Sequence, residues 1–228
     1  MSGGWFITGT DTGVGKTRVA CMLLTALAQQ GLRVVGMKPV ASGSNATHVG
    51  QRSQDAELLM AASSVSADYG DINPYAFAPP CAPAIAAREA NVEIRLDKIL
   101  LHFRRLQQEA QWVIVEGIGG WMVPLGHRLS MVDVARALGL PVILVVGMRL
   151  GCINHAMLTA SAVRREGMSI SGWVANQIDP AMTRLNESII DLERSLEIPL
   201  LASFPYQSPN DPCNRLPDFP LHRLLPLV

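Results

Sequence analysis

The sequence has few of the features that would direct it to a membrane or to a polyanionic partner. Charged residues make up 17% of the 228 residues, and lysine plus arginine equals aspartate plus glutamate at 19 each, so the formal net charge is zero. That balance gives no electrostatic reason to expect nucleic acid or an anionic membrane as a partner. The most apolar run, Leu140 to Val146, is far shorter than the roughly 20 residues that span a bilayer.

Cysteine pairs and targeting signals are also lacking. No Cys-x-x-Cys pair and no zinc-like spacing occurs among the four cysteines, which are Cys21, Cys81, Cys152 and Cys213. The N-terminus, Met1 to Trp5, has neither the basic region nor the long apolar stretch of a signal peptide. We therefore expect a cytoplasmic protein whose thiols stay reduced.

What the sequence does contain is a regular alternation of strand-length apolar runs and helical patterns. Strands are expected at residues 5–8, 32–40, 112–115, 142–146, 173–175 and 200–204. Helices are expected at residues 15–30, 55–62, 96–110, 132–138, 155–165 and 181–196. Strands without polar alternation are buried on both faces, which is typical of a parallel sheet with crossover helices. Two long loops, 41–52 and 68–83, are of a length that is often functional.

These patterns predict an α/β protein with a P-loop NTPase-like fold: a mostly parallel central sheet flanked by helices on both faces. No break in composition suggests a second domain, so residues 1–228 are expected to form a single domain.

A glycine-rich segment lies between the first strand and the first helix, where a phosphate-binding loop belongs. Its sequence, Gly9 to Thr17, reads Gly-Thr-Asp-Thr-Gly-Val-Gly-Lys-Thr. Backbone N–H groups of such a loop and the following helix N-terminus bind phosphate oxygens. Lys16 would neutralise β- and γ-phosphate charge, and the Thr17 hydroxyl would ligate Mg²⁺. Five residues rather than the usual four separate Gly9 from the Gly-Lys pair, so a plain connecting turn is the alternative interpretation.

Two acids are candidates for the metal. Glu116 ends the apolar strand 112–115 and precedes a glycine-rich segment at 117–120. In a parallel sheet the carboxyl ends of the strands face the ligand crevice, so Glu116 is placed to reach Mg²⁺. Asp55 stands at the start of a helical pattern, where it would serve equally well as a first-turn acid that stabilises the helix. Mg²⁺ needs only one or two carboxylates beside phosphate oxygens.

A second lysine, Lys38, follows the second predicted strand in the segment Lys-Pro-Val-Ala-Ser-Gly at 38–43. A lysine at this place is often only a surface charge. It would have a chemical purpose if the acceptor of the phosphoryl group were also an anion, because the repulsion between two anions must be screened.

At this point the sequence resembles the dethiobiotin synthetase family over nearly the whole chain. The matching segments are 9–17, 38–43, 115–121, 142–147, 150–156 and 172–176. The most specific are the 38–43 segment and Leu-Gly-Cys-Ile-Asn-His-Ala at 150–156, and the five-residue spacing of the loop is the family's own form. The resemblance implies that 7,8-diaminononanoate is carboxylated with CO₂ or bicarbonate to a carbamate. ATP then activates the carbamate as a carbamic–phosphoric anhydride, and the second amine closes the ureido ring to give dethiobiotin, ADP and phosphate.

The resemblance also implies roles for individual residues. Thr12, Lys16 and Lys38 would be catalytic and would surround the carbamate and the transferred phosphoryl group. Thr17, Asp55 and Glu116 would serve Mg²⁺. The substrate would contact Ser42 and the segment Gly151, Cys152, Ile153 and Asn154, in which the backbone of Cys152 matters rather than its thiol. ATP would contact Gly13, Val14, Gly15, Lys16, Thr17, Asp55, Glu116, Gly117, Gly119, Asn176, Gln177, Pro205 and Tyr206.

In the family the substrate site lies between two subunits. The resemblance therefore implies a homodimer in which residues 151–154 of one chain offer a helix N-terminus to the carboxylate of the substrate bound by the other chain.

Two alternative functions remain open from the residues alone. One is a related amide- or cobyrinate-type ligase, although no glutaminase-like pattern is present. The other is a nucleotide-switch ATPase of the partitioning type, although Asp11 and Thr12 stand where such loops usually carry a lysine.

Overall fold

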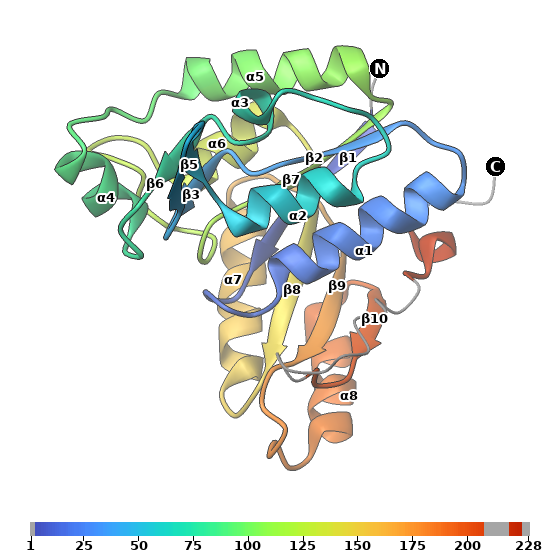
Figure 1. The fold of residues 1–228 in the computed structure, drawn as a ribbon. Helices are drawn as coiled ribbons and strands as arrows, with labels where there is room; N and C mark the ends of the chain where they lie inside the picture. The colour runs from blue at the N-terminus through green and yellow to red at the C-terminus, as the bar shows by residue number, and fades with distance from the viewer. Residues whose placement is uncertain (1–2, 208–218, 225–228) are drawn as a thin grey trace.

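The centre of the protein is a six-stranded, wholly parallel β-sheet (Figure 1). A computed structural model describes residues 3–207 and 219–224. The strand order is β10-β9-β8-β1-β7-β2. The strands are β1 (Gly3–Gly9), β2 (Val34–Met37), β7 (Trp112–Glu116), β8 (Val142–Met148), β9 (Ile170–Gln177) and β10 (Leu200–Phe204). The first strand of the chain therefore lies in the interior of the sheet, between β7 and β8.

Alternate residues of each strand enter different hydrophobic clusters, as the two-residue period of a strand requires. Ile7, Ile114 and Val145 pack with α1 (Lys16–Gln29). Phe6 and Val115 pack with the helices of a second cluster. Those helices include α5 (Leu96–Glu109) and α6 (Met131–Leu138), while α7 (Cys152–Arg165) and α8 (Leu185–Leu196) cover β8 and β9 in a third cluster. The predicted α/β architecture with helices on both faces is confirmed.

Local signals fix several of these helices. Ser130 caps α6: its hydroxyl accepts the backbone N–H of Asp133, whose carboxylate accepts the Ser130 N–H in return. Gly139 ends the same helix in the left-handed conformation, with φ of 66°. By contrast, α1 and α7 begin after Gly15 and Gly151, and neither has a side-chain cap. Their first N–H groups thus remain available for a ligand.

The predicted strand at 32–40 is wrong in its second half. The main-sheet strand β2 ends at Met37, and a separate strand, β3 (Val40–Ser42), pairs in parallel with β6 (Tyr75–Phe77). Pro39 cannot donate a ladder hydrogen bond, and the N–H of Lys38 donates instead to the Ile72 carbonyl. The chain therefore leaves the sheet at Lys38.

The two expected long loops also contain regular structure. Residues 41–52 include the antiparallel pair β4 (Asn45–Thr47) and β5 (Gly50–Arg52), followed by α2 (Gln54–Ala62). Residues 68–83 include α3 (Tyr69–Ile72) and β6, and α4 (Pro83–Glu89) follows. In Figure 1 these elements form a lobe beside α2, on the side of the sheet where β2 is the edge strand. A short 3₁₀ helix, η1 (Leu221–Arg223), contacts α1.

The boundaries of the expected helices differ by more than one residue at two places: α7 begins at Cys152 rather than 155, and α8 begins at Leu185 rather than 181. Within residues 3–207 and 219–224, the helices are all too short or too polar to cross a membrane.

Candidate active site

The loop between β1 and α1 has the backbone of a phosphate-binding loop. Gly13 and Gly15 have φ values of 73° and 92°, a region that residues with a side chain rarely adopt. A Cβ on Gly15 would also lie 2.3 Å from Nδ2 of Asn176. Since α1 starts at Lys16 without a side-chain cap, its first N–H groups point at the loop with the positive end of the helix dipole. The arrangement can hold an anion.

The unusual spacing of the loop has a simple structural reason. Thr10, which stands where a glycine is usual, extends the pairing of β1 with β8: its N–H donates to the Val145 carbonyl over 3.0 Å. Its hydroxyl accepts the N–H of Gly147. The additional residue therefore continues the strand, and the turn itself is made by the residues that follow it.

Lys16 lies inside this loop and is only 6% exposed. Its Nζ donates to the carbonyl of Asp11 over 2.9 Å, while the Asp11 carboxylate binds Arg149 at the end of β8 over 2.7 Å. Burial, together with repulsion from Lys38, lowers the pKa of Lys16 to about 8 against the attraction of the nearby carboxylates. The ammonium is thus poorly solvated and would gain from an anionic ligand.

Lys38, Asp55, Glu116 and Thr17 converge beside the loop, as expected for residues that follow the carboxyl ends of neighbouring strands. The Nζ of Lys38 lies 2.8 Å from Asp55 and 2.6 Å from Glu116. The Thr17 hydroxyl lies 3.0 Å from Asp55 and 2.9 Å from Glu116. Lys38 and Glu116 are almost fully buried, whereas the side chain of Asp55 is 42% exposed.

The charges of this cluster depend on one another. Burial alone would lower the pKa of Lys38, but Glu116 and Asp55 outweigh it and the net pKa is raised, so the ammonium stays charged. Burial would raise the pKa of Asp55, but Lys38 and Thr17 hold it below its ordinary value. Burial raises the pKa of Glu116 in spite of the same lysine. The Oε2 atom of Glu116 is buried and has no hydrogen-bond partner among the described residues.

These oxygens fit a magnesium ion. Mg²⁺ takes hard oxygen ligands such as two carboxylates and one hydroxyl, beside water and phosphate oxygens. Oε2 of Glu116, which has no hydrogen-bond partner among the described residues, is suited to be one of these ligands. In the described part of the chain, no three or more His, Cys, Asp or Glu side chains gather in a group that could hold a metal ion.

The glycine-rich segment after β7 lies against the loop. The N–H of Gly117 donates to the Ile7 carbonyl, and its carbonyl accepts from Nζ of Lys38. A Cβ on Gly119, whose φ is 62°, would come within 3.5 Å of the Thr12 hydroxyl. Thr12 itself is exposed at the loop's turn. Gly119 therefore lies beside Thr12, and Gly117 lies beside Ile7 and Lys38.

Four of the predicted ATP-contacting residues also lie together: Asn176, Gln177, Pro205 and Tyr206. Arg18, which the sequence analysis did not single out, joins two of them. Asn176 donates to the Val14 carbonyl over 2.8 Å and accepts from Arg18 over 3.1 Å. Arg18 also donates to the Pro205 carbonyl, and the N–H of Tyr206 donates to the side chain of Gln177. The only sequence signal for Arg18 was its position directly after Thr17, in the first turn of the loop's own helix.

The predicted substrate residues are less connected within one chain. Ser42 ends β3 and is half-buried. Cys152 is buried, whereas Ile153 and Asn154 are exposed at the uncapped start of α7. Within the described residues, no hydrogen bond or ion pair joins the 151–154 segment to Lys16, Thr17 or Lys38. Leu150, which is 95% exposed, begins an apolar surface that we call the α7 face: Leu150, Ile153, Met157 and Leu158.

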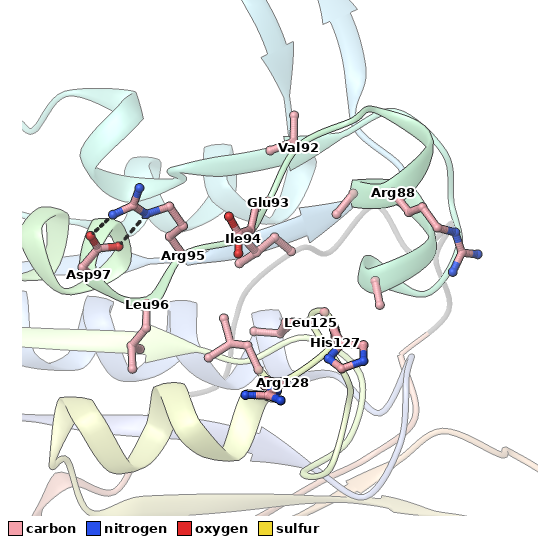
Figure 2. Close-up of a pocket in the computed structure, with 14 residues that line it drawn as sticks. Arg88, Val92, Glu93, Ile94, Arg95, Leu96, Asp97, Leu125, His127 and Arg128 are labelled. Atoms are coloured by element: carbon pink, nitrogen blue, oxygen red, sulfur yellow. Dashed lines mark hydrogen bonds and ion pairs between the residues drawn. The ribbon is translucent and has the colours of Figure 1, made fainter.

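A separate cavity of about 890 Å³ lies between the segment that follows α4 and the loop 125–129 (Figure 2). Ile94 and Leu125 contribute apolar surface to it. Its rim mixes cations with acids, and Arg95 is already paired with Asp97. None of the predicted site residues lines this cavity, so it is distinct from the candidate active site.

Comparison with solved structures identifies the fold. The septum site-determining protein MinD of Pyrococcus horikoshii, in complex with Mg-ADP, matches with a TM-score of 0.56 and 16% identity over 91% of this chain and 82% of its own. A ParA family ATPase of Chlorobium tepidum matches with a TM-score of 0.55 and 15% identity over 91% of this chain and 86% of its own. At such low identity the likeness concerns the fold alone. The sheet and the loop together define a P-loop α/β protein of the nucleotide-binding class.

Sequence comparison narrows this class to one family. A family model described as an AAA domain matches residues 4–213. Three relatives are each called ATP-dependent dethiobiotin synthetase BioD. The relative from Nitrosospira multiformis is 53% identical over 92% of both chains. The relative from Aromatoleum aromaticum is 50% identical over 91% of this chain and 92% of its own, and the one from Xanthomonas euvesicatoria is 49% identical over 89% of this chain and 91% of its own. The chain belongs to the ATP-dependent dethiobiotin synthetase family.

Proposed function

We propose that the protein is an ATP-dependent cyclo-ligase that converts 7,8-diaminononanoate, CO₂ or bicarbonate, and ATP into dethiobiotin, ADP and phosphate in biotin biosynthesis. Family membership supports the overall reaction. The structural observation that carries the proposal is the presence of a second buried lysine, Lys38, beside the phosphate loop. A simple hydrolase needs one lysine for the nucleotide phosphates, whereas transfer to an anionic acceptor needs charge on the acceptor's side as well.

In the proposed mechanism the first amine is captured as a carbamate, and the γ-phosphoryl group of ATP passes to the carbamate oxygen. The bond from γ-phosphorus to the β,γ-bridging oxygen breaks, and ADP leaves. The second amine then attacks the carbamoyl carbon, phosphate departs and the ureido ring closes. Lys16 and the N–H groups at the start of α1 hold the transferring phosphoryl group. Lys38 turns from its two carboxylates toward the carbamate, and Thr12 and Ser42 donate hydrogen bonds to it.

Mg²⁺ would be held by Thr17, Asp55 and Glu116, and when bound it supplies charge neutralisation at the nucleotide phosphates. The chain's own part is electrostatic. The ammonium of Lys38 bridges the two carboxylates. With Mg²⁺ held by these carboxylates, Lys38 would be free to face the acceptor.

The base of the nucleotide would lie beside the end of β9 and the segment that follows β10. Asn176 is buried against the loop and shares hydrogen bonds with Val14 and Arg18. We propose that Asn176 and Gln177 contact the base, and that Pro205 and Tyr206 close over it. Gly13 to Thr17, Gly117 and Gly119 would contact the phosphates.

We also propose that the active form is a homodimer. The α7 face exposes four apolar side chains to solvent, among them Leu150 and Leu158, which are 95% and 62% exposed. A second copy that covers this face would bring the uncapped N-terminus of its α7, residues 151–154, to the substrate carboxylate. Residues 1–228 would act as one domain, and the three free described cysteines, Cys21, Cys81 and Cys152, suit a cytoplasmic location.

The test is phosphate release from MgATP and bicarbonate, with and without 7,8-diaminononanoate, with the product identified by its mass. We expect phosphate release that depends on the diamine, and a product of the mass of dethiobiotin. Hydrolysis of ATP that is indifferent to the diamine would refute the proposal and favour a nucleotide-switch ATPase or a related ligase. Light scattering of the eluting protein should give twice the 24.6 kDa chain mass if the dimer is correct.

A further inference from the structure

Both backbone polar groups of Lys38 are held by the segment at the end of α3. The Lys38 N–H donates to the carbonyl of Ile72 over 2.8 Å, and the Lys38 carbonyl accepts from Nδ2 of Asn73 over 2.6 Å. Asn73 is itself only 4% exposed, and its Nδ2 donates a second bond to the Tyr75 carbonyl. Because Lys38 has left the sheet ladder, these contacts are what fixes its backbone.

The same segment also holds the start of the helix that carries Asp55. The hydroxyl of Tyr69 donates to Oδ1 of Asn73 over 2.9 Å and accepts the N–H of Ser53 over 2.7 Å. Ser53 is the residue at the N-terminal cap of α2, and Asp55 stands in the first turn. One continuous chain of hydrogen bonds, which we call the relay, thus joins the backbone of Lys38 to the start of α2 through the side chains of Tyr69 and Asn73.

One further contact fixes Tyr69 in this place. The guanidinium of Arg52 lies over its ring at 3.8 Å from the centroid. Burial raises the pKa of Tyr69 against the hydrogen bond from Ser53 and the charge of Arg52, so the phenol keeps its proton near neutral pH. The phenol donates that proton to Asn73 and accepts the N–H of Ser53, so every donor and acceptor along the chain of hydrogen bonds is defined.

We propose that Tyr69 and Asn73 are positioning residues that set the distance between Lys38 and Asp55. This proposal rests on the proposed function for the roles of those two side chains. The ion pair of Lys38 with Asp55 spans 2.8 Å, and the two residues belong to different segments: Lys38 follows the end of β2, and Asp55 stands at the start of α2. A shift of either segment would change where Lys38 points once a ligand is bound.

The test compares Tyr69→Phe with the matched control Tyr75→Phe. Each change removes one phenolic oxygen from the same region, but the Tyr75 hydroxyl accepts from the N–H of Arg95 and has no path to Lys38 or Ser53. We expect Tyr69→Phe to lower kcat and to raise the Mg²⁺ concentration for half-maximal turnover, each by roughly three- to tenfold, the factor that one ordinary hydrogen bond gives. Tyr75→Phe should leave both unchanged. Equal effects of the two changes would overturn the proposal.

Asn73→Ala and the double variant with Tyr69→Phe test whether the relay acts as one unit. If it does, the double variant should lose no more activity than Asn73→Ala alone, and multiplied losses would count against the relay. Thermal unfolding of each variant shows whether lost activity follows lost folded protein, which would contradict a positioning role.

Calorimetric titration of MgATP separates failure of this proposal from failure of the proposed function. If the wild-type protein does not use the diamine, weakened MgATP binding in Tyr69→Phe but not in Tyr75→Phe would still support the relay. Unchanged binding in Tyr69→Phe would overturn it.

Discussion

Lys16 should make the ligand-free protein less stable than an apolar residue would. Its pKa is lowered from 10.5 to about 8, mainly by burial. A shift of that size corresponds to roughly 3 kcal/mol at about 1.4 kcal/mol per pKa unit. We therefore expect Lys16→Met, whose unbranched side chain is one atom shorter, to raise the free energy of unfolding by about 1–3 kcal/mol at pH 7. The lost hydrogen bond to the Asp11 carbonyl offsets the rest of the gain.

The dependence on pH gives this prediction its sign. A lowered pKa means that the folded protein binds fewer protons at Lys16 than the unfolded chain does between about pH 8 and 10.5. Stability of the wild type should therefore rise with pH across this window, since stability rises wherever the unfolded state binds more protons. The penalty is fully present below pH 8 and vanishes near pH 10.5, so the advantage of Lys16→Met should shrink as the pH rises.

Urea unfolding of both proteins at pH 7 and pH 9.5, without nucleotide, measures this difference. The same variant should lose most MgATP binding, which calorimetry would show. A variant that is less stable than the wild type at pH 7, or an advantage that is the same at both pH values, would refute the assignment of a strained, poorly solvated ammonium to Lys16.

Three other predictions concern the neighbouring residues. The Lys38→Ala variant should lose most turnover and be less stable than the wild type by about 3–5 kcal/mol, because Glu116 is left buried without its cation. Millimolar Mg²⁺ should recover part of the lost melting temperature, and a loss of stability that Mg²⁺ does not change would contradict this. Thr17→Val should raise the Mg²⁺ concentration needed for half-maximal turnover, so an unchanged titration would argue against Thr17 as a ligand. Asn176→Ala should raise KM for ATP by roughly tenfold with a smaller effect on kcat, since a buried amide that bonds to the loop is lost; an unchanged KM would exclude it from nucleotide binding.

The phosphate loop could be predicted from the sequence because its determinants are local. Gly13 and Gly15 permit a backbone that other residues avoid, and Lys16 and Thr17 follow in the first turn of the helix. The approach of Glu116 to the loop was also predictable. It needs only the rule that parallel strands present their carboxyl ends at one edge of the sheet.

The partners of Lys38 could not be predicted in this way. Glu116 is 78 residues from Lys38 in the chain, and the two meet only because β7 lies beside β2. The relay through Tyr69 and Asn73 was hidden for a different reason: the 68–83 segment shows no helical or strand period, since α3 and β6 are only four and three residues long. Predictions from periodicity fail for elements this short.

The α4 helix was missed because its sequence, Pro83 to Glu89, is rich in alanine and carries no clear amphipathic stripe. The base-binding residues were placed by family resemblance, but their link through Arg18 depends on contacts that span up to 187 residues of the chain. Long-range contacts of this kind follow from the completed sheet and leave no local pattern.

The interior place of β1 has a consequence for the synthesis of the chain. Both neighbours of β1, β7 and β8, are encoded far downstream, and even β2 cannot pair with it because β7 lies between them. A ribosome that adds about 5–20 residues per second takes on the order of 5–20 s to reach Trp112 after finishing β1. During that time the nascent chain carries an apolar strand without its neighbours, so the phosphate loop attached to it cannot acquire its shape until β7 has been translated.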